Sequence, residues 1–157
     1  MQIKLISIGK TDNANLQTLI EDYTKRLSHY IRFNFEIIPD IKNVKHLSEA
    51  QQKDKEGDLI LSKIQKSDVV ILLDENGKQI NSIAFSGYLQ KRMNSGIKTL
   101  IFVIGGPYGF SETVYKRANG KLGLSQMTFS HQMVRLFFIE QLYRGFTILK
   151  NEPYHHR

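Results

Sequence analysis

The sequence predicts an α/β fold in which a mostly parallel sheet is flanked by helices. Apolar runs of strand length alternate with amphipathic segments along the whole chain. Two of these runs, 69–73 and 100–104, contain no break and are typical of strands buried on both faces. The length of 157 residues and the hydrophobic content of 41% fit one domain, 1–157, with a sizeable core.

The first half of the chain predicts two strands and two helices. The ranges 2–8 and 33–38 read as strands, and the second ends at Pro39. A helix is expected over 11–30, where apolar residues recur at helical spacing. Ser48 and Gln51 have the spacing of a capping box for a helix that reaches about residue 65. Its polar middle, 49–58, is expected to be exposed.

The second half continues the alternation. A strand over 69–73 is expected to end in a turn at 74–77, and a helix follows over 81–94. Next come a strand over 98–104, a short helix near 111–118, a fifth strand over 121–124 and a helix over 130–150. The last helix is apolar on nearly all sides, which a domain of this size rarely encloses. We therefore expect a homodimer that covers its outer face.

Composition and charge narrow the function classes. The net charge is +7, and residues 116–157 hold seven Lys and Arg against two Glu, which points to a polyanion such as nucleic acid. With no cysteine, disulfides and thiolate chemistry are excluded. The histidines show no metal-ligand spacing, and no metal is expected. With no signal-peptide layout and no apolar stretch of membrane-spanning length, we expect a cytoplasmic protein without a membrane segment.

A glycine-rich turn, 105–109, follows the strand that ends at Ile104. Ligands of open α/β sheets bind at the carboxyl ends of the strands, and glycines let a ligand approach the backbone. The turn matches neither G-x-G-x-x-G nor a P-loop, and Pro107 lacks an N–H for a phosphate. A flat heterocycle such as adenine suits it better. The segment 122–129 offers a second loop that could wrap a small ligand. Ordinary strand-to-helix connections explain both segments equally well.

Three side chains are candidates for proton transfer, and one segment is a candidate for binding RNA. Asp74 lies just beyond a strand, His131 at a helix start and His155 near the C-terminus. Tyr154 and His155 lie in a short aromatic and basic tail, a composition that can stack an unpaired RNA base. A frayed terminus is the alternative.

Five motifs together closely resemble one family. They are Val-Ile-Leu-Leu-Asp-Glu-Asn-Gly (70–77), Phe-Val-Ile-Gly-Gly-Pro-Tyr-Gly (102–109), Leu-Ser-Gln-Met-Thr-Phe (124–129, continuing to Arg135), Glu-Gln-Leu-Tyr-Arg (140–144) and Pro-Tyr-His (153–155). The family is the bacterial large-subunit ribosomal RNA methyltransferase H, within the SPOUT or α/β-knot superfamily. The resemblance implies a deep C-terminal trefoil knot, a homodimer and S-adenosylmethionine as cofactor. It implies a cofactor site made of Leu73, Gly105, Leu124, Ser125, Gln126, Met127, Thr128 and Phe129.

The resemblance further implies methylation of N3 of a pseudouridine in helix 69 of the large-subunit RNA, within assembled ribosomes. We expect Arg135, Arg144, Tyr154 and His155 to hold the RNA. The base that accepts the N3 proton stays open among His155, His131 and Asp74. Two alternatives remain: a SPOUT methyltransferase that acts on transfer RNA, and a ribosome- or RNA-binding knot protein without catalysis.

Overall fold

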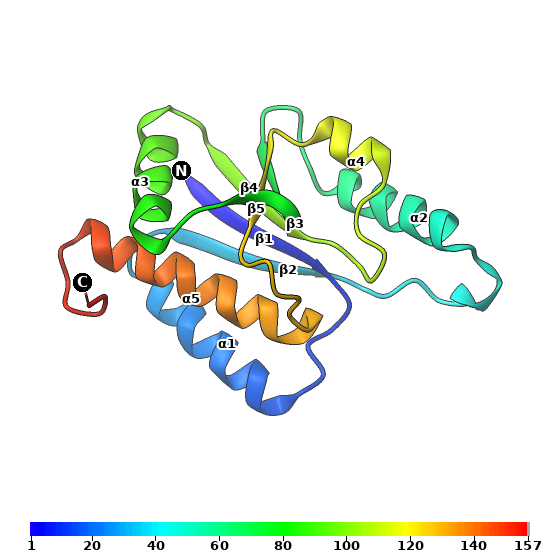
Figure 1. The fold of residues 1–157 in the computed structure, drawn as a ribbon, viewed down its shortest axis with the longest axis horizontal. Coiled ribbons are helices and arrows are strands. Elements are labelled where there is room, and N and C mark those ends of the chain that lie inside the picture. The colour runs from blue at the N-terminus through cyan, green and yellow to red at the C-terminus, as the bar shows by residue number, and fades with distance from the viewer. Residues whose placement is uncertain (157) are drawn as a thin grey trace.

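Five parallel strands form one sheet in the order β2–β1–β4–β3–β5 in the computed structural model, which describes residues 1–156 (Figure 1). The strands are β1 (Gln2–Ile8), β2 (Arg32–Ile38), β3 (Val69–Gln79), β4 (Thr99–Ile104) and β5 (Gly120–Gly123). Their parallel pairing confirms the predicted α/β class. No helix in the described range is both long and apolar enough to cross a membrane.

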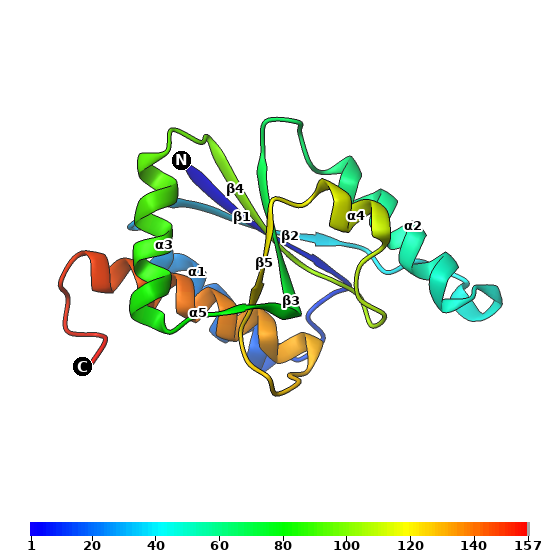
Figure 2. The same ribbon diagram turned by 45° about the horizontal axis from the view of Figure 1, so that its top comes forward.

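Helices cover both faces of the sheet. They are α1 (Ala14–Leu27), α2 (Glu49–Ser62), α3 (Ser82–Asn94), α4 (Glu112–Arg117) and α5 (His131–Leu149), with a short 3₁₀ turn, η1, at Val44–His46. One face carries α1, α3 and α5, which share a hydrophobic cluster, and the other carries α2 and α4 (Figure 2). The fold is therefore a three-layer α/β/α sandwich.

Strand β4 lies at the centre of the sheet, and all six of its residues are buried. It pairs with β1 on one side and β3 on the other. Phe102 points to the cluster of α1, α3 and α5, where its ring centroid lies 4.7 Å from that of Phe138. Ile101 and Val103 point to the cluster of α2 and α4. The unbroken apolar run predicted this two-sided burial.

The helix starts follow local capping chemistry. Asn13 accepts hydrogen bonds from the N–H groups of Asn15 and Leu16, so α1 begins at Ala14 rather than at residue 11. The capping box of Ser48 and Gln51 is present at the start of α2, as predicted. The expected exposure of the α2 middle is wrong at two positions, because Glu56 and Gly57 are buried.

Strand β3 is longer than the sequence predicts. A turn was expected at 74–77, but the strand continues to Gln79. Its register with β5 shifts between Leu73 and Lys78, so that Leu122 pairs with both ends of the irregular stretch. The polar residues at 74–77 bulge out beside β5 instead of reversing the chain.

Helix α5 buries only part of its wide apolar surface. Phe138, Ile139 and Leu142 lie in the core that α5 shares with α1 and α3. Met133 and Phe137 remain 43% and 38% exposed. The predicted homodimer would cover them, and it stays a prediction.

Alanine substitutions at two glycines, one in β3 and one in α3 as the control, test how tightly β3 and β5 are packed. A Cβ on Gly77 would lie 2.5 Å from the carbonyl carbon of Leu122, so we expect Gly77→Ala to destabilise the fold by about 2 kcal/mol. Gly87 lies in α3 with open space around it, and Gly87→Ala should stabilise by about 0.5 kcal/mol. Urea denaturation of both variants measures the difference. Equal effects of the two substitutions would contradict the tight β3–β5 contact.

Candidate active site

A cavity of about 440 Å³ opens where β4 and β5 end, beside the irregular stretch of β3. We call it the loop pocket. It brings together all but one of the residues predicted to hold a cofactor: Leu73, Gly105, Leu124, Ser125, Met127, Thr128 and Phe129. Gln126 is exposed and does not line it. Asp74 and His131, two of the three candidate bases, also line the loop pocket, whereas His155 does not.

The glycine turn forms one wall of the loop pocket, and its first two glycines have little room for a side chain. A Cβ on Gly105 would lie 3.2 Å from the Phe110 ring, and one on Gly106 would overlap the carboxyl group of Glu56. The Gly109 N–H donates to the Gly106 carbonyl oxygen at 3.1 Å, and Gly109 has φ of +80°. The turn thus closes on itself and presents the backbone of Gly105 and Gly106 to the pocket, beside the side chains of Pro107 and Tyr108.

Acidic side chains dominate the charge of the loop pocket. Asp74 and Glu75 line it, and no Lys or Arg is among its lining residues. The Asn76 N–H donates to Asp74 Oδ1 at 2.8 Å, and the Tyr115 hydroxyl donates to Asp74 Oδ2. Burial and this hydrogen bond raise the pKa of Tyr115 to about 12. The loop pocket therefore disfavours phosphate and suits a ligand with an apolar body and a positive charge.

Glu56 lies behind the glycine turn, on α2. It is 3% exposed, and its Oε1 has no hydrogen-bond partner within the described residues. Burial raises the pKa of Glu56, and the charge of Asp40 raises it further. Its place in an almost wholly polar stretch of the sequence predicts exposure and gives no sign of this burial.

The C-terminal tail is held in place rather than frayed. The Tyr154 hydroxyl donates to Glu140 Oε1 at 2.9 Å and lies 3.1 Å from the Tyr23 hydroxyl. The Arg144 guanidinium lies 4.7 Å from the centroid of the Tyr154 ring and pairs with Glu140 at 2.5 Å. An Arg144 nitrogen also lies 3.3 Å from His155 Nδ1. Three of the four predicted RNA contacts, Arg144, Tyr154 and His155, thus form one cluster, which we call the tail cluster.

The prediction that Arg135 holds RNA is wrong in this structure. Its side chain is buried, with 1% exposure, and it donates to the Ile8 carbonyl oxygen at 2.8 Å and to Thr11 Oγ1 at 3.0 Å. Burial lowers its pKa. Arg135 binds the carboxyl end of β1 to α5 and has no surface to offer to a nucleic acid.

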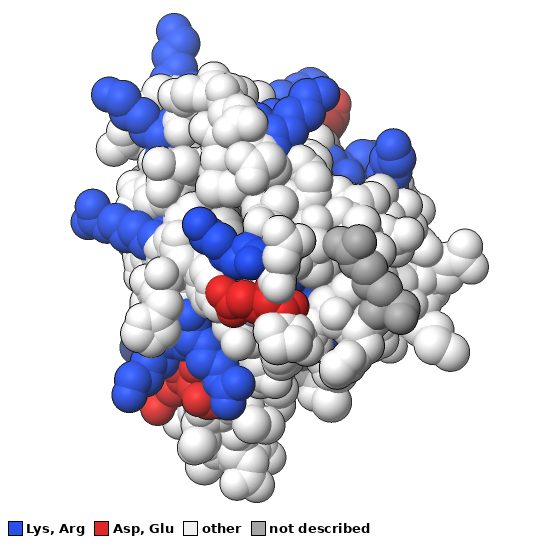
Figure 3. Space-filling view, turned by 90° about the vertical axis from the view of Figure 1, so that its left-hand side faces the viewer, with Lys and Arg blue, Asp and Glu red and all other residues white. Residues whose placement is uncertain are grey.

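The loop pocket and the tail cluster lie at opposite ends of α5. The pocket loops follow the carboxyl ends of the strands, whereas the tail folds back near the opposite end of α5 (Figure 1). Lys and Arg side chains gather on the face that carries the tail (Figure 3). The last turns of α1 and α3 carry Lys25, Arg26, Lys91 and Arg92.

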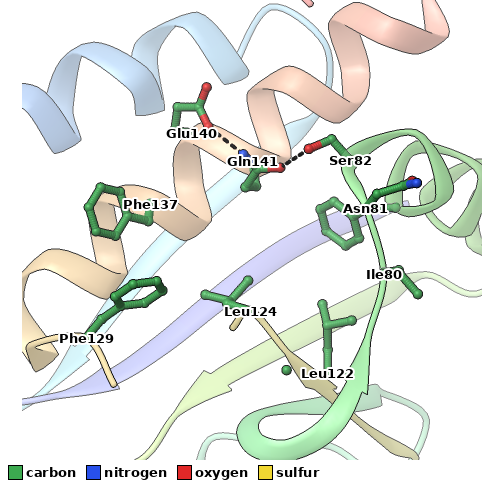
Figure 4. Close-up of a pocket in the computed structure, with 11 residues that line it drawn as sticks. Ile80, Asn81, Ser82, Leu122, Leu124, Phe129, Phe137, Glu140 and Gln141 are labelled. Carbon is green, nitrogen blue, oxygen red and sulfur yellow. Dashed lines mark hydrogen bonds between the residues drawn. The ribbon is translucent and has the colours of Figure 1, made fainter. Parts of the chain in front are cut away.

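A second cavity, also about 440 Å³, lies between α3, β5 and α5 (Figure 4). We call it the helix groove. Leu124 and Phe129 line both cavities, and the Phe129 ring centroid is 5.3 Å from that of Phe137. At its polar end Ser82 Oγ donates to Gln141 Oε1 at 2.7 Å. The groove is mostly apolar and open, and no motif of the sequence pointed to it separately.

Comparisons with known proteins agree with this geometry. A family model described as a predicted SPOUT methyltransferase matches residues 1–155. Proteins named ribosomal RNA large subunit methyltransferase H are 76% identical in Flavobacterium johnsoniae and 78% identical in Flavobacterium psychrophilum, over all 157 residues of both chains. The protein of that name from Parabacteroides distasonis is 62% identical over 156 residues, 99% of each chain. The fold and the family match are thus those of a SPOUT methyltransferase. More narrowly, the chain belongs to the ribosomal RNA large subunit methyltransferase H family, as the motifs indicated.

The buried carboxyl group of Glu56 makes stability depend on pH. Its raised pKa means that the folded state favours the protonated form, so wild-type stability falls as pH rises from the ordinary Glu value. Glu56→Gln keeps the shape without the charge. We expect this variant to be more stable than wild type at pH 8, with the advantage shrinking toward pH 4.5.

Thermal unfolding of both proteins from pH 4.5 to pH 8 measures this effect. Asp58→Asn, on the exposed side of the same helix, serves as the control and should track wild type. A constant offset between Glu56→Gln and wild type across this range would show that Glu56 does not titrate as its burial requires.

Proposed function

We propose that this chain transfers a methyl group from S-adenosylmethionine to N3 of a pseudouridine in helix 69 of the large-subunit ribosomal RNA, in assembled ribosomes. The loop pocket carries the proposal, because it gathers the predicted cofactor residues at the carboxyl ends of the strands. Membership of the ribosomal RNA large subunit methyltransferase H family supports the choice of substrate. Such an enzyme would work in the cytoplasm, where bacterial ribosomes are.

The residues of the loop pocket fit the proposed cofactor. The bare backbone of Gly105 and Gly106 leaves space for a flat adenine, and Leu73 and Leu124 supply apolar walls. The Asp74 and Glu75 side chains favour a positive charge. S-adenosylmethionine when bound supplies a methyl group on a positively charged sulfonium. The protein's main task is then alignment, which contributes about 7–11 kcal/mol in well-oriented reactions.

The N3 proton of the substrate must leave for the reaction to finish. Both oxygens of Asp74 already accept hydrogen bonds, one from Tyr115 and one from Asn76, which leaves less room for a substrate N–H to reach them. His131 lies exposed at the edge of the loop pocket, with room for a substrate base to approach. His155 lies in the tail cluster and serves only if a second copy brings it to the pocket. We favour a histidine over Asp74 as the proton acceptor.

A homodimer is part of the proposed function. Phe137, Met133 and Ile83 are at least 38% exposed, on α5 and α3 beside the helix groove. Burial of this surface would stabilise a pair of chains. The separation of the tail cluster and the loop pocket along α5 gives a second argument, since a partner chain would bring a second loop pocket toward this tail. Arg144, Tyr154 and His155 are therefore proposed to hold RNA for the partner's pocket.

We also propose that the C-terminal part of the chain forms the trefoil knot of its family. The end of β5 presses against the irregular part of β3, where a Cβ on Gly123 would lie 2.8 Å from the Gly77 carbonyl oxygen. After β5, residues 124–130 lead the chain into α5. Helix α5 lies on the face of the sheet that holds α1 and α3. A close backbone crossing of this kind suits a threaded chain, and the predicted single domain 1–157 would contain the knot.

Methyl transfer from radiolabelled S-adenosylmethionine tests the reaction. The substrates are ribosomes and bulk transfer RNA from a strain that lacks the matching gene. We expect label on ribosomes alone, and mass spectrometry of the helix 69 fragment should show one added methyl on a pseudouridine. Label on transfer RNA instead would favour the first alternative. Cofactor binding without transfer, or no cofactor binding by calorimetry, would favour a non-catalytic RNA-binding protein.

The dimer has a separate test. Phe137→Glu places a charge on the surface beside the helix groove, so we expect a monomer in sedimentation at micromolar concentration and at least tenfold lower methyl transfer. Leu19→Glu, at a position of α1 that is 45% exposed against 38% for Phe137, is the matched control and should remain a dimer. A monomeric wild type with full activity would rule out the dimer.

A further inference from the structure

Unlike its polar neighbours on α2, Glu56 lies against the glycine turn. Its carboxyl group occupies the space into which a Gly106 side chain would project, on the side of the glycine turn away from the loop pocket. A Cβ on the adjacent Gly57 would overlap the hydroxyl of Ser111, which caps the start of α4 two residues after the turn. Helix α2 thus packs closely against Gly106 in the glycine turn and against the start of α4.

This arrangement costs the fold stability. Glu56 is the least exposed acidic side chain among the described residues, and its Oε1 accepts no hydrogen bond there. A buried carboxyl group without a full set of partners destabilises a protein, and a glutamine or an aliphatic side chain would fill the same space at lower cost. Costly groups of this kind concentrate at functional sites.

The Glu56 carboxyl group and the loop pocket are separated by little more than the Gly106 backbone. Gly106 contacts the Glu56 carboxyl on one side and lines the loop pocket on the other. Backbone without side chains or solvent separates the two, so the negative potential is weakly screened. A cationic ligand in front of the turn gains from that potential, and a neutral ligand of the same shape does not.

We propose that Glu56 is a positioning and specificity residue of the loop pocket. Its carboxyl group braces the glycine turn from behind, and its negative charge makes the loop pocket prefer the positively charged methyl donor over the neutral thioether product. The inference rests on the proposed function for the identity of the cofactor. It assigns Glu56 no contact with the reacting atoms.

Calorimetric titration with S-adenosylmethionine and S-adenosylhomocysteine at pH 8.5 separates the two roles. Glu56→Gln keeps the shape and removes the charge, so the donor should bind about tenfold more weakly while product affinity changes less than about twofold. Glu56→Ala removes both, and both ligands should bind more weakly. Glu56→Asp should restore part of the donor preference. Asp58→Asn, exposed on the same helix, should leave both affinities unchanged.

Amide hydrogen exchange of residues 105–110 in the ligand-free protein tests the bracing role without any cofactor. We expect faster exchange in Glu56→Ala than in wild type and in Glu56→Gln. Equal loss of both ligands in Glu56→Gln would overturn the charge role, and unchanged exchange in Glu56→Ala would overturn the bracing role. If wild type bound neither ligand, the proposed function would fail and the charge role with it, while the exchange result would still decide the bracing role.

Discussion

The parallel pairing of β4 with both β1 and β3 is the constraint on which the rest of the structure depends. It places a wholly apolar strand between two helical layers and sends its side chains alternately to each. Because the strands are parallel, the carboxyl ends of β3, β4 and β5 lie at one edge of the sheet. The glycine turn and the loop 124–129 therefore lie beside Leu73, although 50 residues of the chain separate Leu73 from Leu124.

The parts that the sequence predicted well are those governed by local rules. The apolar runs identified the central strands, the capping box placed the start of α2, and the glycine turn marked the pocket. The extension of β3 was missed because 74–79 is polar, and only pairing with β5 at the sheet edge makes it a strand. Glu56 was missed for a related reason: a glutamate in a polar helix looks solvated until a distant turn covers it.

Arg135 and the tail show how tertiary contacts override a residue's usual role. An arginine on an apolar helix suggests a phosphate contact, but the helix start packs on the end of β1, where backbone and hydroxyl oxygens accept its hydrogen bonds. The tail has the composition of a frayed end, yet Tyr154 meets Tyr23, more than 100 residues earlier, and Glu140 on the neighbouring helix. No local pattern encodes a partner at that separation.

The place of α5 has a consequence for synthesis of the chain. Phe138, Leu142 and Phe146 complete the core that α1 and α3 begin, and they belong to the last element to be made. Strand β1 likewise pairs with β4, which begins 97 residues later in the chain and is therefore made later. Until α5 has left the ribosome, a nascent chain exposes the part of the sheet face that α5 covers. A chain that stops short of α5 therefore lacks part of its core and is an aggregation hazard rather than a smaller enzyme.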